Sequence, residues 1–293
     1  MRSIHLASGA TEELAKLISK YHKLVLHIYT KGDKSIKIIV IAGTAEATSI
    51  IDKLLDMNIN VLATVTTRLG MESIHNRKGL HIYQGRLTQK NLESLIAEEM
   101  PDGLIDASNP FAKDISKNVL KISIKCNLPY LHYERKEIKS QGKDIIRVKT
   151  YDQAVEKLIE HKGNIMLTVG SSKIEMFTKI PNFKKRIFLR VLPDVKIISR
   201  CEKLGFNPGN IIAIKGPFTE ELNVQLIKYC NASIMVTKES GNTGGTIEKI
   251  SAARTLNIPT LMIERQEFTC ENKTDSLEGV IKYIEKIIGL NAI

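Results

Sequence analysis

Short runs of β-branched residues alternate with helical patterns along almost the whole chain, and this alternation sets the fold class. The first run is residues 37–42, KIIVIA, and a helical pattern with one apolar face follows at residues 44–58. Strands that alternate with helices form parallel sheets with crossover helices. Further strands are expected at residues 61–66, 81–83, 103–107 and 130–133, with helices at 87–99 and 110–126.

The alternation resumes after a polar segment at residues 136–144. Strands are expected near Ile145, Ile165, Ile187, Ile211, Ile234 and Thr260, and a last helix at residues 276–288. We therefore predict an α/β protein of two doubly wound, Rossmann-like parallel-sheet domains with a ligand cleft between them. Residues 36–136 form the dinucleotide-binding domain and residues 145–293 the substrate-binding domain. Residues 1–35 precede the first strand as an extension, and the sequence leaves open whether they belong to the native protein.

The amino-acid composition limits the class of protein to which the chain can belong. The chain has 293 residues, of which 43% are hydrophobic and 26% charged, the balance of a soluble globular protein. No apolar run is long enough to span a membrane, and the N-terminus lacks the apolar core of a signal peptide. The four cysteines are widely spaced, which indicates reduced thiols in the cytoplasm. The histidines lack metal-ligand spacing, so we expect no metal.

The chain is strongly basic, with a net charge of +11. A basic protein can bind nucleic acid, a membrane surface or an acidic small molecule. Aromatic residues make up only 5% of the chain and tryptophan is absent, which argues against stacking on single-stranded nucleic acid. The charge therefore favours a polyanionic small ligand, with neither nucleic acid nor membrane as partner.

The turn after the first strand has the features of a phosphate site. Gly43 allows a phosphate to approach the backbone, Thr44 offers a hydroxyl, and the N–H groups of a helix follow. Glu46 falls in the first helical turn, where the helix dipole favours a carboxylate. The alternative is a plain turn with Thr44 as the helix N-cap.

Two further strand ends carry cofactor-site candidates in the first domain. Thr66, Thr67 and Arg68 follow the second strand, where an acidic residue would bind the ribose of NAD and an arginine accommodates the 2′-phosphate of NADP. Arg68 therefore favours NADPH, with NADH as the alternative. In DASNPFA, at residues 106–112, Pro110 fits the first position of a helix capped by Asn109. Ser108 and Asn109 would then lie near the nicotinamide, and Asp106 is interpreted as structural.

In the second domain, basic residues follow four strands. Lys173, Arg190, Lys215 and Lys238 all lie at or after the carboxyl ends of strands in one predicted sheet. These ends meet at one edge of a parallel sheet, so the four cations should converge. Such a rim suits a ligand with several carboxylates.

The turn between the strand at Ile234 and the next helix is rich in glycine and hydroxyl residues. Glycines permit positive φ angles and close backbone approach, and free N–H groups at the helix start can bind an anion. Lys238 and Lys249 add positive charge beside the turn. We predict a substrate site here that includes Ser240, Gly241, Thr243, Gly244, Gly245 and Thr246.

Together these motifs resemble the precorrin-6A reductase family, including its cobalt-precorrin-6A form, over about residues 36–265. Two positions depart from the family pattern: Ala42 replaces a glycine, and Asn109 stands where a histidine is usual, which removes an imidazole as proton donor at that position. The matching segments are Ala42 to Glu46, Asp106 to Ala112, Arg190 to Pro193, Gly216 to Asn223 and Thr237 to Lys249.

The resemblance implies an oxidoreductase that uses NADPH or NADH to reduce a ring double bond in precorrin-6A or cobalt-precorrin-6A, a step of cobalamin biosynthesis. It implies a polycarboxylate corrinoid precursor as substrate and transient contacts with neighbouring pathway enzymes. Ser108 and Asn109 are the only candidates for a catalytic role. The alternatives are another Rossmann-type nucleotide-dependent enzyme, such as a methyltransferase, or a non-catalytic nucleotide-binding protein.

Overall fold

The computed structural model describes residues 35–137 and 142–290. The expected N-terminal extension, apart from Ser35, lies outside the described residues. The chain forms two compact units, and it passes from one to the other between Glu134 and Arg135 and again between Phe268 and Thr269.

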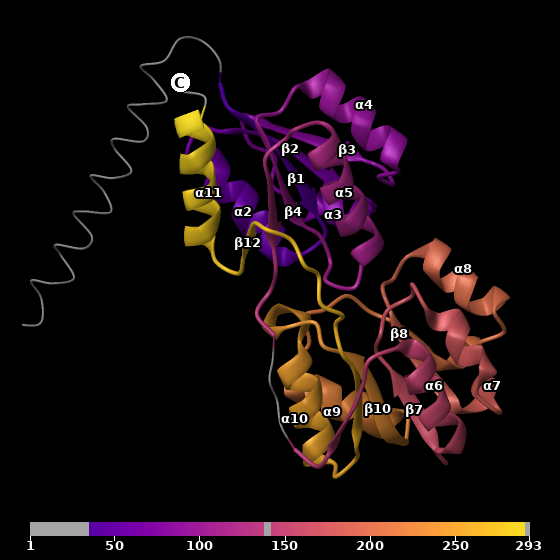
Figure 1. Ribbon diagram of the computed structural model, residues 1–293. Helices are drawn as coiled ribbons and strands as arrows, with labels where there is room; N and C mark the ends of the chain where they lie inside the picture. The colour runs from indigo at the N-terminus through magenta and orange to yellow at the C-terminus, as the bar shows by residue number, and fades with distance from the viewer. Residues whose placement is uncertain (1–34, 138–141, 291–293) are drawn as a thin grey trace, which may run out of the picture. The chain divides into compact units, whose positions relative to one another are not determined.

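The first unit is built on a parallel sheet with the strand order β12-β5-β4-β1-β2-β3. Figure 1 shows helices packed along this sheet. Its elements are β1 (Lys37–Ala42), α2 (Ala45–Asp56), β2 (Asn60–Val65), α3 (Arg68–Glu72), β3 (Leu80–Gln84), α4 (Gln89–Glu99), β4 (Gly103–Ala107), α5 (Lys113–Lys125), β5 (Tyr130–Tyr133), β12 (Lys273–Thr274) and α11 (Leu277–Leu290).

The second unit contains another parallel sheet, with the order β6-β11-β10-β7-β8-β9. Its strands are β6 (Ile145–Val148), β7 (Asn164–Leu167), β8 (Ile187–Val191), β9 (Ile211–Ala213), β10 (Ala232–Lys238) and β11 (Thr260–Ile263). Its helices are α6 (Tyr151–Glu160), η1 (Ile174–Lys179), α7 (Phe183–Arg186), α8 (Val195–Lys203), η2 (Pro208–Asn210), α9 (Glu220–Tyr229), η3 (Asn242–Gly244) and α10 (Thr246–Thr255). The prediction of two parallel-sheet α/β domains is confirmed.

The last segment of the chain returns to the first unit, whereas the sequence assigned it to the second domain. After Phe268 the chain forms β12, which pairs in parallel with β5 through Lys273 opposite His132 and Thr274 opposite Tyr133. Helix α11 then covers the same sheet. The physical reason is its apolar face, which needs a sheet to cover it and finds one in the first unit.

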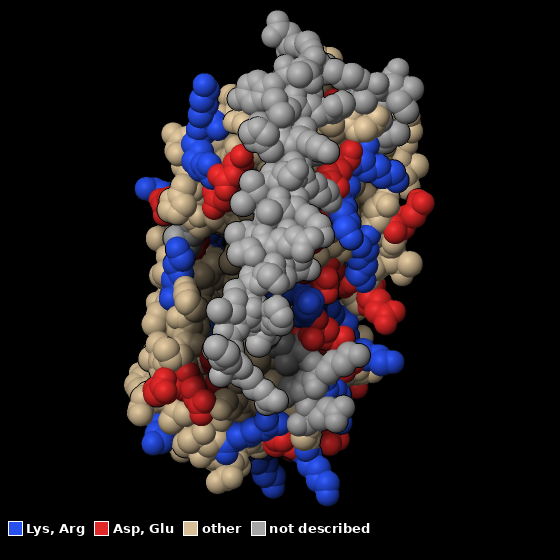
Figure 2. Space-filling model, turned by 90° about the vertical axis from the view of Figure 1, so that its left-hand side faces the viewer, with Lys and Arg blue, Asp and Glu red and all other residues tan. Residues whose placement is uncertain are grey.

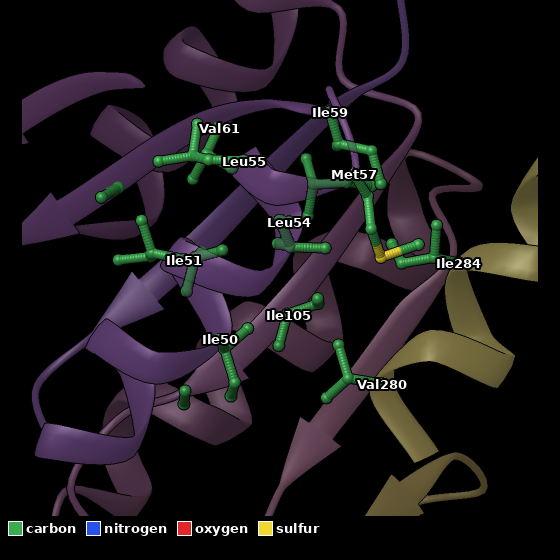
Figure 3. Close-up of a cluster of buried hydrophobic side chains, with 14 of the residues drawn as sticks. Ile50, Ile51, Leu54, Leu55, Met57, Ile59, Val61, Ile105, Val280 and Ile284 are labelled. Atoms are coloured by element: carbon green, nitrogen blue, oxygen red, sulfur yellow. The ribbon is translucent and has the colours of Figure 1, made fainter. Parts of the chain in front are cut away.

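The core of the first unit joins α2, the central strands and α11. Figure 3 shows Val280 and Ile284 of α11 next to Ile50 and Leu54 of α2 and Ile105 of β4. All five side chains have 0% exposure. The backbone of β4 approaches α11 so closely that a Cβ on Gly103 would lie 2.5 Å from Cδ1 of Ile287. The C-terminal helix is therefore part of the first unit's core.

Within residues 35–137 and 142–290, none of the helices has the length and apolarity required to cross a membrane. Figure 2 shows acidic and basic side chains interspersed over the visible described surface. The basic excess is therefore not gathered into one patch on this face.

We expect Ile284→Ala to lower the free energy of unfolding of the first unit by about 2–5 kcal/mol, because it removes a fully buried side chain and leaves a cavity. Urea unfolding measures this change. Lys282→Ala, at an exposed position of the same helix, is the control. A loss below about 0.5 kcal/mol for Ile284→Ala, the range of surface changes, would mean that α11 does not belong to this core.

Candidate functional site

The turn after β1 exposes Gly43 at the start of α2. Thr44 is the N-cap: its hydroxyl accepts from the N–H of Ala47 at 3.2 Å and donates to the carbonyl of Ala107 at 3.1 Å. The Thr44 side chain is therefore a helix N-cap, as in the alternative interpretation of the sequence. Its single hydroxyl proton already takes part in the hydrogen bond to Ala107. Glu46 lies in the first turn of α2. The backbone of this turn, rather than the Thr44 hydroxyl, is what an anion can approach.

The turn after β4 lies directly against the turn after β1. A Cβ on Gly43 would sit 3.4 Å from the backbone nitrogen of Asn109 and 3.6 Å from Cα of Ser108. This close approach brings together two of the three predicted cofactor segments of the first unit. Ser108 is buried, and its Oγ lies 3.3 Å from Oγ of Ser116, whereas Asn109 is exposed.

The predicted helix start at Pro110 is wrong. Helix α5 begins at Lys113, with Ala112 as its N-cap and no side-chain cap hydrogen bond. Asn109 instead accepts from the N–H of Phe111 at 3.0 Å through its Oδ1. This local bond makes a turn of its own before the helix, a competition typical of asparagine.

A buried polar cluster supports the β4 turn. The carboxylate of Asp106 accepts from the N–H of Ser108 at 3.0 Å and from the hydroxyl of Tyr130 at 3.1 Å, and it lies 3.2 Å from Nδ1 of His132. Burial alone would raise the pKa of Asp106. The hydrogen bond and charge of His132, with hydrogen bonds from Ser116 and Ser108, outweigh burial and hold that pKa below its usual range. The structural interpretation of Asp106 fits these contacts.

The end of β2 presents an exposed arginine. Arg68 is the first residue of α3, its side chain is 83% exposed, and its Nε donates to Oε1 of Glu72 at 2.8 Å. Thr67 is the N-cap of α3 and accepts from the N–H of Gly70 at 3.0 Å, while Thr66 is exposed. Because β1 pairs with both β2 and β4, these residues follow a strand adjacent to β1.

The four predicted cations of the second unit lie at or after the ends of neighbouring strands, in the order β10, β7, β8, β9. Lys238 is the last residue of β10, Arg190 is the last but one of β8, and Lys173 and Lys215 follow β7 and β9. They differ in burial. Lys173 and Lys215 are exposed, whereas Arg190 is 6% exposed. Its Nη1 donates to Oδ1 of Asn223 at 2.7 Å, and its guanidinium lies 4.2 Å from the ring centroid of Phe218. Burial lowers the pKa of Arg190 to about 10.

The half-buried Lys238 and the buried Lys249 form a cation cluster with Arg190. Burial lowers the pKa of Lys238 to about 8. Burial, and then the charges of Arg190 and Lys238, lower the pKa of Lys249 to about 7, against an opposing effect of Glu248. The surroundings therefore disfavour the charged form of both lysines relative to an exposed lysine, and an anion placed among them would favour the charged forms. Lys249 was predicted only as a charge beside the turn, because its burial cannot be read from its position.

The glycine loop, residues 239–245, connects β10 to α10. Ser240 donates its N–H to Oγ1 of Thr246 at 3.2 Å, and Nζ of Lys249 donates to the carbonyl of Gly244 at 2.8 Å. Gly241 and Gly245 have φ values of 73° and 65°, as the glycine-rich sequence predicted. Gly245, in the left-handed conformation, is the N-cap of α10. Thr243 is exposed on the loop.

A family profile described as Precorrin-6x reductase CbiJ/CobK matches residues 37–285. The chain belongs to this family. It is 34% identical over 246 residues to a cobalt-precorrin-6A reductase of Priestia megaterium, covering 83% of this chain and 96% of the relative. It is 33% identical over 275 residues to a cobalt-precorrin-6A reductase of Methanothermobacter thermautotrophicus, covering 86% and 90%.

The fold agrees with a solved member of the family. The structure described as CobK precorrin-6A reductase matches with a TM-score of 0.71 at 22% identity, covering 86% of this chain and 97% of that one. Membership in this reductase family makes the chain an oxidoreductase acting on a CH–CH group with a nicotinamide cofactor. Among the described residues, no group of three or more His, Cys, Asp or Glu side chains is arranged to hold a metal ion.

Sequence reasoning missed the residues that support the site. Phe218 and Asn223 hold Arg190, and His132 and Tyr130 hold Asp106. Phe218 and Asn223 lie inside the family segment from Gly216 to Asn223, so the motif carried a signal for them. The partners of Asp106 come from β5, and no local sequence pattern predicts these contacts.

We expect Asp106→Asn to lower the free energy of unfolding by about 1.5–3 kcal/mol at pH 7, the range for hydrogen bonds to a charged group. The folded-state pKa lies below the ordinary value of 3.8, so the ionised carboxylate stabilises the fold above that pH and loses this effect as the pH falls through the folded pKa. The difference between the two proteins should therefore shrink below about pH 4.

Chemical unfolding at several pH values measures this dependence. Asp114→Asn, an exposed aspartate in the first turn of α5, is the control. An Asp106→Asn protein as stable as the unaltered protein at pH 7 would contradict a stabilising role for the carboxylate.

Proposed function

We propose that this protein reduces a ring double bond of cobalt-precorrin-6A with a hydride from NADPH, in the formation of the corrin ring. The observation that carries the proposal is the family match over residues 37–285 together with the cation cluster of the second unit. The cobalt form is favoured because the relatives at 31% identity or more that the comparisons give are named cobalt-precorrin-6A reductases. Relatives named precorrin-6A reductase match at 23% and 27%.

The first unit has the features that a nicotinamide dinucleotide needs. The exposed Gly43 and the N-terminus of α2 offer backbone N–H groups to a pyrophosphate. Thr66, Thr67 and Arg68, after β2, suit the ribose and its 2′-phosphate, and the exposed guanidinium of Arg68 favours NADPH over NADH. Ser108 and Asn109 lie against Gly43, so one ligand can touch both turns.

The second unit has the features that a ring with several carboxylates needs. Arg190 and Lys249 are buried and Lys238 is half-buried, and the charges of Arg190 and Lys238 lower the pKa of Lys249. Binding carboxylates among them would offset the cost of burying the cations. Lys173 and Lys215, after the neighbouring strands, extend the positive charge to the exposed edge. The glycine loop adds backbone donors from Ser240 to Thr246.

In this proposal the protein supplies orientation and charge complementarity. The bound cofactor supplies the hydride. The protein's part is to bind the carboxylates of the ring through the cation cluster and to hold the reacting carbon facing the cofactor. Ser108 and Asn109 are the residues proposed to lie beside the nicotinamide. Asn109 has no titratable group, so a proton that reaches the neighbouring ring carbon must come from another donor.

The experiment that tests this function is anaerobic incubation of the full chain with NADPH and cobalt-precorrin-6A or its metal-free form. We expect NADPH oxidation and a product heavier by two hydrogens, faster with the cobalt form. Faster turnover of the metal-free ring would assign the other substrate. No turnover of either ring would contradict the proposal.

We expect Arg68→Ala to weaken NADPH binding about tenfold or more and to leave NADH binding nearly unchanged, because only NADPH has the 2′-phosphate that a guanidinium can pair with. Calorimetric titration with each cofactor measures this. Arg86→Ala, an exposed arginine after the neighbouring strand β3, is the control. Equal affinities of the unaltered protein for the two cofactors would refute the preference.

We expect Lys238→Ala to raise the KM for the ring substrate about tenfold, with cofactor affinity nearly unchanged, because it removes one cation of the cluster. The loss should shrink at high ionic strength, where salt already screens the attraction in the unaltered protein. Lys228→Ala, an exposed lysine in the last turn of α9, is the control. If NADPH affinity falls instead, the roles of the two units are reversed.

A further inference from the structure

The acidic residue that opens the glycine loop is buried. Glu239 follows β10 directly and has 0% exposure. Its N–H donates to the carbonyl of Ile263 at 2.9 Å, and its Oε1 accepts from the N–H of Gly241 at 3.2 Å. A buried carboxylate needs hydrogen bonds and a cation to keep its charge. The first residue of the loop therefore carries a buried negative charge that a nearby cation must balance.

Arg265, just after β11, balances this charge. Its Nε donates to Oε2 of Glu239, and the two side chains are 7% and 0% exposed. The same guanidinium donates from Nη1 to the carbonyl of Arg135 and from Nη2 to the carbonyl of Lys136, the latter at 3.3 Å. One side chain thus joins the start of the loop to the segment at residues 135–136.

The loop also contacts this segment directly. Nη1 of Arg135 donates to the carbonyl of Ser240. Gly241 packs so closely that a Cβ there would lie 2.2 Å from Cδ of Arg135 and 3.3 Å from the carbonyl oxygen of Lys136. Its φ of 73° is also one that other residues rarely adopt. The first two residues of the loop after Glu239 are therefore fixed through both backbone and side-chain contacts.

The position of these contacts in the chain indicates their role. The second unit begins at Arg135 and ends at Phe268, shortly after Arg265. The ion pair therefore joins the loop to both ends of the unit's chain. A buried ion pair adds little net stability over an apolar pair of the same shape, because desolvation opposes the attraction, but it can fix one arrangement of the groups around it. That effect is what a ligand-binding loop requires.

We propose that Glu239 and Arg265 are positioning residues, which hold residues 240–245 in the conformation that binds the anionic substrate. This inference rests on the proposed function of the loop. The pair acts through the backbone of Ser240 and Gly241 rather than by contact with the substrate. Its loss should therefore weaken substrate binding far more than it changes the turnover of bound substrate.

The test compares the unaltered chain with the double variant Glu239→Gln/Arg265→Met, which removes both charges and leaves neither one buried alone. In the ligand-free protein, amide hydrogen exchange at residues 240–245 should rise about tenfold or more, while Val236 and Leu261 in the central strands change less than about twofold. In turnover assays, the KM for cobalt-precorrin-6A should rise about tenfold, with kcat within about threefold.

Two single variants sharpen the comparison. Glu175→Gln removes the carboxylate that Arg200 contacts at 2.7 Å on the surface of the same unit, and it should change neither loop exchange nor KM. Arg265→Lys keeps the charge, but one ammonium cannot span the three acceptors of the guanidinium fork, so loop exchange should still rise. If the double variant fails to fold, Arg265→Lys provides the same measurements.

A uniform rise in exchange with an unchanged KM would overturn the proposal, because it would make the pair a general support of the fold. Unchanged exchange in the loop would overturn it as well. Failure of the proposed function looks different, since the unaltered chain would then turn over neither ring. In that event the exchange data for the ligand-free chain still decide whether the pair holds the loop.

Discussion

Three cations, two of them buried and one half-buried, at the carboxyl ends of β8 and β10 and in the first turn of α10 are the constraint on which the second unit depends. The charges of Arg190 and Lys238 act on Lys249, and burial lowers the pKa of each of the three. Such a cluster is costly to bury in a folded chain unless anions balance it. The supporting contacts from Asn223 and Phe218 hold Arg190 in place despite this cost. The energetic cost of packing these cations therefore depends on the charge of the ligand that binds to them.

Much of the fold could be predicted because strands here are short, largely buried runs between turn residues. The runs at residues 37–42, 103–107 and 130–133 are strands with those same bounds. The last helix was also predicted, at residues 276–288 against an observed Leu277–Leu290. Its unit was not, because the pairing of β12 with β5 is a long-range contact of two residues that leaves no local pattern.

The candidate site was predictable to the extent that strand ends define it. The pattern located Gly43, Arg68 and Lys238 at such ends, but it could not separate the buried Arg190 from the exposed Lys215, because burial depends on the helices packed above the sheet. The start of α5 was missed because the Asn109 side chain forms its own turn. The Glu239–Arg265 ion pair could not be predicted from the sequence either, because the two residues meet only when β10 and β11 are paired.

The most direct test of this account is the proton uptake that accompanies substrate binding. Calorimetric titration of cobalt-precorrin-6A into the cofactor-free protein at pH 8, in buffers of different ionisation enthalpy, measures that uptake. With pKa values of about 8 for Lys238 and about 7 for Lys249, both lysines are partly neutral at this pH, whereas Arg190, with a pKa of about 10, stays charged. Bound carboxylates should recharge the two lysines. The account predicts uptake of about one proton per ring bound, reduced in Lys249→Met. Binding without proton uptake would contradict it.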